Sequence, residues 1–274
     1  MKTIQIVPVL CVALLASGCK TVKTTAPGEV GVSRSQNMSV SAAAVDQSAA
    51  QAYEAMVKQA RANNVLNRDP KQTVRVRMIA NRLIEQAGVF RPDAKDWSWQ
   101  INVLTSKDLN AFCMPGGRIM VYTGLIERLN LTDDELATVM GHEIAHALRE
   151  HSREAMSRAY RQQMGLGALA AIAGLNDASM QLANILSDVT FTLPRSRTQE
   201  TEGDQIGLEL MARAGYDPKA ALSLWKKMSQ AGQGATPGFL STHPSSSTRT
   251  SEIQALLPKV EPLYQAARQQ AKTH

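Results

Sequence analysis

His142-Glu143-Ile144-Ala145-His146 is the stretch from which the fold and the chemistry of this chain can be worked outward. On an α-helix, residues four apart lie on one face, about 5.4 Å apart along the axis. Both imidazoles can therefore reach one ion at about 2.0 to 2.1 Å, as in catalytic zinc sites. Glu143 lies about 100° round the helix from His142, so it is poorly placed as a ligand but well placed to accept a proton from a water on the metal. The plainer interpretation is two solvated histidines beside a surface glutamate.

These five residues lie inside a predicted amphipathic helix. Thr132-Asp133-Asp134-Glu135 is typical of a capping box at a helix start. Histidines on or beside the apolar face of this helix would be buried and would need partners, which favours a metal. The apolar residues that follow the capping box at helical spacing are Leu136, Val139, Met140, Ile144, Ala147 and Leu148.

A zinc site that keeps one position for water needs a third protein ligand. A longer motif with Gly and His further along the same helix is excluded, because Arg149 and Ser152 stand at those positions. His151 is out of phase with His146 on a continuous helix. We interpret it as a surface or structural histidine.

A later segment supplies a better third ligand. Glu200 and Asp204 are four residues apart on a helix that is predicted to end at Gly215. Glu200 would coordinate the metal, and Asp204 would accept the Nδ1 hydrogen of a ligand histidine and fix its tautomer. Glu202 would point to the other side of this helix, where we interpret it as a solvated carboxylate near the helix start.

Four segments in order resemble the M48 zinc metallopeptidases, a family that includes the HtpX, Ste24 and Oma1 branches and a group of small bacterial lipoproteins. Along the chain they are NAF…PGG at residues 110–117, HExxH at 142–146, ExxxD at 200–204 and an HP…R loop at 243–249. The resemblance covers about residues 70–257. It implies one zinc ion per subunit, with His142, His146 and Glu200 as ligands and Glu143 as general base. Cys113 and Gly203 depart from the residues common in the family, and neither removes a ligand.

A hairpin is expected ahead of the zinc helix. Residues 97–104 alternate as a strand, a Gly-Gly pair marks a turn, and residues 118–122 form a second strand. A strand edge at Asn110, Ala111 and Phe112 would bind an extended peptide through main-chain hydrogen bonds. The equally open alternative is that the hairpin only covers the helix.

His243 lies in a loop rich in Ser, Thr, Pro and Gly, where a lone histidine is usually solvated. The resemblance places this loop over the active-site cleft. There His243 would either occupy the fourth zinc position and hold the enzyme inactive, or take a catalytic part by stabilising the developing oxyanion. Arg249 would contact substrate at the same place or only pair with a carboxylate.

The N-terminus resembles a bacterial lipoprotein signal peptide over residues 1–18. The apolar run at residues 4–15 is shorter than the roughly 20 residues of a transmembrane helix, and Ala16-Ser17-Gly18-Cys19 follows it. Cleavage before Cys19 and lipidation of its thiol would anchor the protein to a membrane. Lys20 rather than Asp after the cysteine favours the periplasmic face of the outer membrane over the inner membrane. Ordinary secretion with Cys19 unmodified is the alternative.

Cysteine and charge counts limit the disulfides and the binding partners that are expected. Cys11 would leave with the signal and Cys19 would be lipidated, so Cys113 has no partner and no disulfide is expected. Without residues 1–18, 29 Lys and Arg residues face 24 acidic ones, a formal charge of +5. This excess suits an anionic membrane surface or simple solubility, and no array of basic and aromatic residues indicates nucleic acid.

Residues 42–274 are long enough for one good core and are expected to form a single M48-like peptidase domain. Its expected fold is α+β and zincin-like (gluzincin), mostly helical, with a small sheet or hairpin beside the HExxH helix. Residues 19–41, from the lipidated cysteine onward, are expected to be a flexible tether. The other helices are expected from residue 42 to the break at 63–64, at 73–87, 218–229, 245–257 and 261–272, and over the core at 165–175.

The sequence therefore predicts a zinc-dependent endopeptidase of the bacterial cell envelope, acting on peptides and proteins. The resemblance implies misfolded or misassembled envelope proteins as substrates and leaves open a partner complex in envelope assembly. One alternative is a chaperone-like or assembly factor with zinc capped by His243, whose main activity is peptide binding at residues 110–112. Another is a structural lipoprotein without metal.

Overall fold

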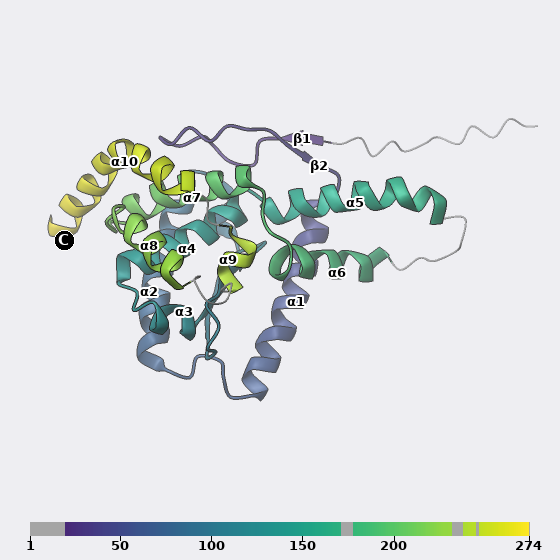
Figure 1. Ribbon diagram of the computed structural model, residues 1–274, viewed down its shortest axis with the longest axis horizontal. Helices are drawn as coiled ribbons and strands as arrows, with labels where there is room; N and C mark the ends of the chain where they lie inside the picture. The colour runs from purple at the N-terminus through teal and green to yellow at the C-terminus, as the bar shows by residue number, and fades with distance from the viewer. Residues whose placement is uncertain (1–19, 171–177, 232–237, 245–246, 274) are drawn as a thin grey trace, which may run out of the picture.

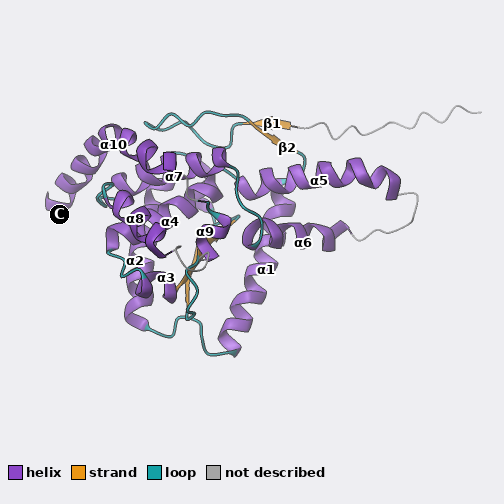
Figure 2. Ribbon diagram, in the orientation of Figure 1, coloured by secondary structure: helices purple, strands orange, loops and turns teal. Residues whose placement is uncertain are grey.

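The computed structural model describes residues 20–170, 178–231, 238–244 and 247–273, and their side chains except at 163–184, 247 and 273. The signal peptide and Cys19 lie outside the described residues, as do residues 171–177 of the stretch expected to cover the core. The described chain is mostly helical with one three-stranded sheet, which confirms the expected α+β class (Figures 1 and 2). Among the described helices, none combines the length and apolar character needed to cross a membrane.

The elements agree with most of the expected helices, with one exception near the C-terminus. Where two helices were expected at 245–257 and 261–272, a single helix runs through Pro258 and Pro262. Both prolines are exposed and lie four residues apart, so the hydrogen bonds that they remove fall on the solvent side of the helix. In chain order the elements are β1 (Lys20–Val22), β2 (Gln36–Met38), α1 (Ala42–Ala62), α2 (Pro70–Ala87), the 3-10 helix η1 (Pro92–Asp96), β3 (Gln100–Leu104), β4 (Ala111–Met114), β5 (Arg118–Tyr122), α3 (Thr123–Arg128), α4 (Asp133–Leu148), α5 (His151–Ala170), α6 (Ala178–Phe191), α7 (Arg197–Arg213), α8 (Ala220–Ala231), α9 (Gly238–Thr242) and α10 (Ser247–Thr273).

The sheet has the strand order β3-β5-β4, with β5 antiparallel to β4 and parallel to β3. The tight turn between β4 and β5 uses Gly116 and Gly117 at φ values of 78° and 85°, a region that glycine adopts without strain. The expected hairpin therefore exists, but its first strand is β4. The stretch at residues 97–104, expected in that place, supplies β3 at the opposite edge, because the two-glycine turn joins only the strands directly next to it.

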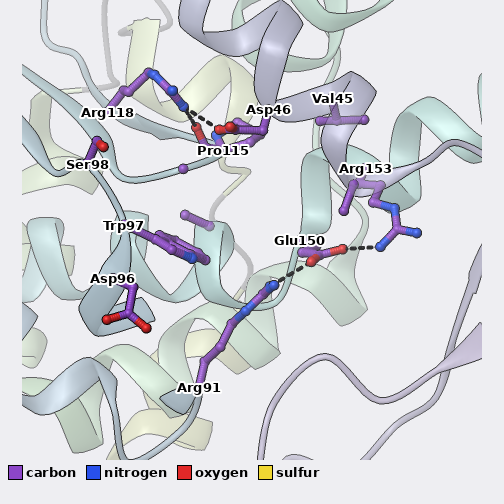
Figure 3. Close-up of a pocket in the computed structure, with 13 residues that line it drawn as sticks. Val45, Asp46, Arg91, Asp96, Trp97, Ser98, Pro115, Arg118, Glu150 and Arg153 are labelled. Carbon is purple, nitrogen blue, oxygen red and sulfur yellow. Dashed lines mark hydrogen bonds and ion pairs between the residues drawn. The ribbon is translucent and has the colours of Figure 1, made fainter. Parts of the chain in front are cut away.

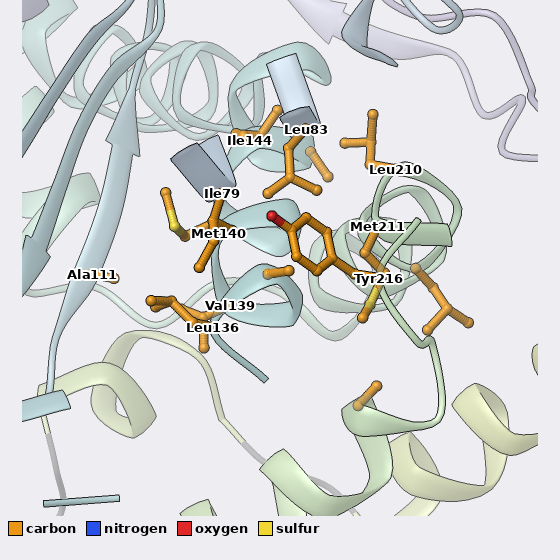
Figure 4. Close-up of a cluster of buried hydrophobic side chains, with 14 of the residues drawn as sticks. Ile79, Leu83, Ala111, Leu136, Val139, Met140, Ile144, Leu210, Met211 and Tyr216 are labelled. Carbon is orange, nitrogen blue, oxygen red and sulfur yellow. The ribbon is translucent and has the colours of Figure 1, made fainter. Parts of the chain in front are cut away.

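The core lies between the sheet, α2 and the two helices that carry the expected zinc ligands, α4 and α7. The capping box of α4 is present: Thr132 Oγ1 accepts from Glu135 N at 3.2 Å, and Glu135 Oε2 accepts from Thr132 N at 2.9 Å. A second capping box starts α7 at Ser196. Side chains of this core shown in Figure 4 include Ile79, Leu83, Leu136, Met140, Ile144, Leu210 and Met211.

Helices α4 and α7 approach each other closely at a pair of glycines. A Cβ added at Gly207 would lie 2.8 Å from the backbone nitrogen of His142, and one added at Gly141 would lie 2.9 Å from the carbonyl oxygen of Gly207. No residue larger than glycine fits at either position without a shift of the backbone. The close approach brings the second expected motif on α7 up to the histidines of α4.

Residues 20–41 do not form the flexible tether that their composition suggested. Strands β1 and β2 pair antiparallel and lie beside α5 (Figure 1), and the chain between them buries Val30 and Val32 in the core. Ser157 on α5 accepts hydrogen bonds through Oγ from the backbone nitrogens of residues 39 and 40. The prediction was wrong because the valines of this segment are buried against the domain rather than diluted in a solvated chain. We call residues 20–41 the N-terminal strap.

Candidate metal centre

Four buried side chains converge where α4, α7 and the loop after α9 meet. Donor atoms of His142, His146, Glu200 and His243 all lie within 4.8 Å of one another. The two Nε2 atoms of the HExxH histidines are 2.9 Å apart, and each is 3.5 Å from a carboxylate oxygen of Glu200. The structure thus brings together the three side chains predicted as ligands and adds His243 to them.

The charges in this cluster suit a cation. Burial would raise the pKa of Glu200, but its pairing with His243 and its hydrogen bond with His142 hold that pKa well below its ordinary range. Burial opposes a charged ring at His142, yet hydrogen bonds with Asp204 and Glu200 raise its pKa to about 9, so without a metal this ring carries positive charge in the cluster and would release its Nε2 proton to a metal that replaces that charge. Burial keeps the pKa of His146 well below its ordinary value, so this ring is neutral, as a metal ligand must be. Two imidazoles and a carboxylate form a donor set that zinc takes.

Glu143 is a carboxylate buried beside the histidines of the cluster. It is 1% exposed, and neither of its oxygens accepts a hydrogen bond from the described part of the chain. The ring of His243 lies beside it, with Nε2 3.3 Å from Oε1. Leaving a buried acceptor unsatisfied costs about 1–3 kcal/mol. A carboxylate whose oxygens are free to accept is suited to take the proton of a water as a general base.

Asp204 contacts the outer nitrogen of the first histidine, at 3.0 Å between Oδ1 and His142 Nδ1. Its other oxygen accepts from Arg249 Nε at 2.5 Å, and Arg249 Nη1 lies 2.7 Å from Glu200 Oε2. The guanidinium also lies over the ring of Trp225, 3.7 Å from its centroid. Arg249 is 4% exposed, so its position agrees with the interpretation that it pairs with carboxylates, and its contact with substrate stays a prediction.

The outer nitrogen of the second histidine meets residues whose burial was not predicted. His146 Nδ1 is 2.6 Å from His151 Nδ1, and His151 Nε2 is 2.9 Å from Glu202 Oε2. Burial lowers the pKa of His151 to about 4, and although burial opposes the charged carboxylate, hydrogen bonds from His151 and Arg34 lower the pKa of Glu202 to about 2. The solvated interpretation of Glu202 was therefore wrong, and His151 is structural rather than superficial.

The burial of both residues has a physical cause. Helix α4 ends at Leu148, and Glu150 has a left-handed backbone with φ of 51°, so α5 starts afresh at His151 and turns its ring back to α4. The expectation that His151 is out of phase with His146 assumed one continuous helix, so it does not apply here. Glu202 is covered by the N-terminal strap, which brings Arg34 Nε to 2.7 Å from its Oε1. In the sequence, the only indication of this role was that Glu202 lies midway between two predicted site residues, Glu200 and Asp204.

The loop with His243, taken here to include the short helix α9 (Gly238–Thr242) that precedes this residue, is fixed over the cluster by backbone hydrogen bonds on two sides. Phe239 N donates to Leu109 O at 2.8 Å, and Arg195 N donates to Thr242 O at 2.9 Å. The rings of Phe239 and His243 are stacked with centroids 4.5 Å apart. This loop therefore connects the turn before α7 with the chain that leads into β4.

The predicted substrate edge belongs to β4, which is an edge strand of the described sheet. Ala111 and Phe112 are buried, and Asn110 is half-buried just before the strand. The ring of Phe112 packs edge-on against Phe191 at 5.2 Å, so its side chain contributes to the core. The backbone of this edge is partly used, because Ala111 N donates to Asn110 Oδ1 at 2.9 Å and Asn110 O accepts from Tyr122 N at 3.0 Å. Its pairing with a peptide stays a prediction.

A separate cavity of about 260 Å³ lies between the start of α1, the β4–β5 turn and the end of α4 (Figure 3). None of the four cluster residues lines it. Its cations are paired: Arg118 with Asp46 at 2.6 Å, and Arg91 and Arg153 with Glu150 at 2.6 and 2.5 Å. The charges in its wall are thus compensated within the chain.

Comparison with known proteins finds a peptidase family and several named metalloproteases. The model of peptidase family M48 matches residues 70–257. The mitochondrial metalloendopeptidase OMA1 of Schizosaccharomyces pombe is 38% identical over 191 residues, which are 69% of this chain and 54% of that protein. The metalloprotease LoiP of Escherichia coli is 27% identical over 256 residues, 93% of this chain and 96% of that protein. The beta-barrel assembly-enhancing protease of Yersinia pestis is 27% identical over 219 residues, 75% of this chain and 43% of that protein. The matched region thus spans about half of the OMA1 protein.

Proposed function

This chain belongs to peptidase family M48, a family of zinc metallopeptidases, and we propose that it is a zinc-dependent endopeptidase that cleaves protein substrates. The observation that carries the proposal is the buried cluster on α4 and α7. Two imidazoles and one carboxylate converge there, and a carboxylate without a hydrogen-bond donor in the described chain lies next to them.

The roles of the residues follow from their positions. A zinc ion held by His142, His146 and Glu200 would polarise the substrate carbonyl and lower the pKa of a bound water towards about 7. Glu143 would accept the proton of that water and pass it to the leaving amine. Asp204 accepts the Nδ1 hydrogen of His142, which turns the Nε2 lone pair of this ring into the cluster.

An extended peptide would bind along β4, at residues 110–112. The support is that β4 is an edge strand and that the loop with His243 is hydrogen-bonded to Leu109, directly before this edge. Pairing through the main chain tolerates many side chains, which suits an enzyme that removes damaged proteins of varied sequence.

Two substitutions test the mechanism. Glu143→Gln keeps the size of the side chain but cannot accept the proton, so zinc should stay bound while cleavage of casein falls by about 10²- to 10⁴-fold. Glu200→Ala should instead lose the zinc. Metal analysis of both variants and of the wild type, together with the casein assay, separates these effects. Full proteolysis by Glu143→Gln would contradict the proposed base.

For location and substrate class, we propose a lipid-anchored enzyme on the periplasmic face of the outer membrane that acts on misfolded or misassembled envelope proteins. The support is the lipobox that ends at Cys19 and the likeness to a bacterial protease named for enhancing β-barrel assembly. Cys19→Ala should move the protein from the membrane fraction to the soluble periplasmic fraction. An unchanged distribution would count against lipidation.

A second candidate function is a chaperone-like or assembly factor with a capped zinc site. The observation that favours it is His243, whose Nδ1 lies 3.1 Å from His142 Nε2 and 3.0 Å from Glu200 Oε1. If His243 caps the metal, His243→Ala should raise casein cleavage. If this residue stabilises the transition state, the same variant should lower it.

A further inference from the structure

The nitrogen of His146 that faces away from the cluster contacts a second buried imidazole. Its Nδ1 lies 2.6 Å from Nδ1 of His151, so one nitrogen must donate and the other accept. Nε2 of His151 lies 2.9 Å from a carboxylate oxygen of Glu202, and an ionised carboxylate only accepts. His151 is fully buried, which opposes a charged ring, and a neutral ring in this position carries its one hydrogen on Nε2 and accepts on Nδ1. The donor must be Nδ1–H of His146, which leaves the Nε2 lone pair of His146 directed at the cluster.

The carboxylate of Glu202, which ends this series of hydrogen bonds from His146 through His151, is held by two arginines. Arg149 on the α4–α5 turn is fully buried and places Nη2 3.0 Å from Glu202 Oε2. Arg34 of the N-terminal strap places Nε 2.7 Å from Oε1. Arg149 also donates to Thr24 Oγ1 and to the carbonyl oxygen of Arg34, so the strap closes over the pair. The carboxylate is thus compensated and oriented from both sides, and water has little access to His151.

We propose that His151 and Glu202 are positioning residues of the metal centre, which fix the tautomer and orientation of His146. The inference rests on the proposed zinc function and extends it to the side of the site opposite Asp204. A hydrogen-bond partner of a ligand histidine orients the ring and raises its basicity, and the loss of such a partner costs about 10- to 100-fold in metal affinity. His151 and Glu202 meet this description without contacting the metal.

Zinc affinity of the full-length chain tests the proposal, measured by competition with a chromophoric chelator. His151→Phe keeps a ring but has no acceptor for His146, and the dissociation constant should rise by about 10- to 100-fold. His151→Gln restores a carbonyl acceptor and an N–H donor, and should recover most of the affinity. The matched control is Ser157→Ala, which removes the hydrogen bonds to the strap backbone at residues 39 and 40 but leaves the pair intact. This control should bind zinc as the wild type does.

A spectroscopic measurement on the wild type covers the case in which His151→Phe does not fold. In zinc-loaded protein with ¹⁵N-labelled histidine, His146 should be protonated at Nδ1, with a scalar coupling across the hydrogen bond to Nδ1 of His151. Protonation of His151 at Nδ1, or equal zinc affinity in the wild type and His151→Phe, would overturn the proposal. Failure of the wild type to bind zinc would instead refute the proposed function, so the two failures are distinguishable.

Discussion

The two histidines of the HExxH motif are held at their Nδ1 atoms by different kinds of partner. Nδ1 of His142 meets a charged pair, Asp204 and Arg249, which comes from α7 and α10. Nδ1 of His146 meets a neutral ring, and the charges on that side lie one residue further out. The first arrangement takes its carboxylate from Asp204, four residues after Glu200 on the same helix, a spacing that the sequence shows, and we call it the charged half of the site. The second requires a break between two helices and a strap from the N-terminus, and we call it the assembled half.

The charged half should respond most strongly when it is broken. Arg249→Ala leaves Asp204 and Glu200 buried without their guanidinium partner. We expect metal-free protein to lose about 3–5 kcal/mol of its free energy of unfolding, the usual result of removing one partner from a buried pair. Zinc brings positive charge to the same carboxylates and should restore part of this loss.

Urea unfolding with and without zinc measures both effects. Arg249→Lys is the matched control, because it keeps the charge but cannot bind two carboxylates through a planar fork. It should lie between the wild type and the alanine variant. A metal-free Arg249→Ala protein as stable as the wild type would show that the charges on this side are not tightly coupled.

The next test concerns the contact that both halves need, the crossing of α4 and α7. A Cβ at Gly207 would press on the backbone at His142, so Gly207→Ala should cost about 1–3 kcal/mol of stability and also weaken zinc binding. Gly88→Ala is the control, since nothing lies within 4 Å of the added atom. Thermal unfolding and chelator competition check both variants. Unchanged zinc affinity in Gly207→Ala would mean that the ligands adapt to a wider helix separation.

The difference between the halves also explains which parts could be predicted from the sequence. The spacing within HExxH and ExxxD fixes which side chains share a helix face, and a capping box fixes where α4 begins, so these features could be read directly. His151 could not, because its orientation depends on the left-handed backbone at Glu150, a residue type that gives no strong turn signal. Gly207 gave no sign of its role either, because a close helix crossing depends on both helices at once.

The N-terminal strap shows the same limit for a whole segment. Its small and polar residues are typical of a tether, yet Val30 and Val32 are buried and Arg34 pairs with two glutamates. Those partners lie more than a hundred residues away in the sequence, on α5 and α7. Composition describes what a segment can do alone, whereas burial of this segment depends on the surface that the rest of the chain offers.

The smallest expected effect comes from the outermost residue of the assembled half. The side chain of Arg34 is 34% exposed, so its ion pairs are screened by solvent, and Arg34→Ala should cost no more than about 1 kcal/mol of stability. Arg149 still holds Glu202 in this variant, so zinc affinity should fall by less than in His151→Phe. Chelator competition at low and high salt measures this, and the difference from wild type should shrink as salt rises. A loss as large as that of His151→Phe would mean that Arg149 alone does not hold Glu202, and that the strap is an integral part of the metal site.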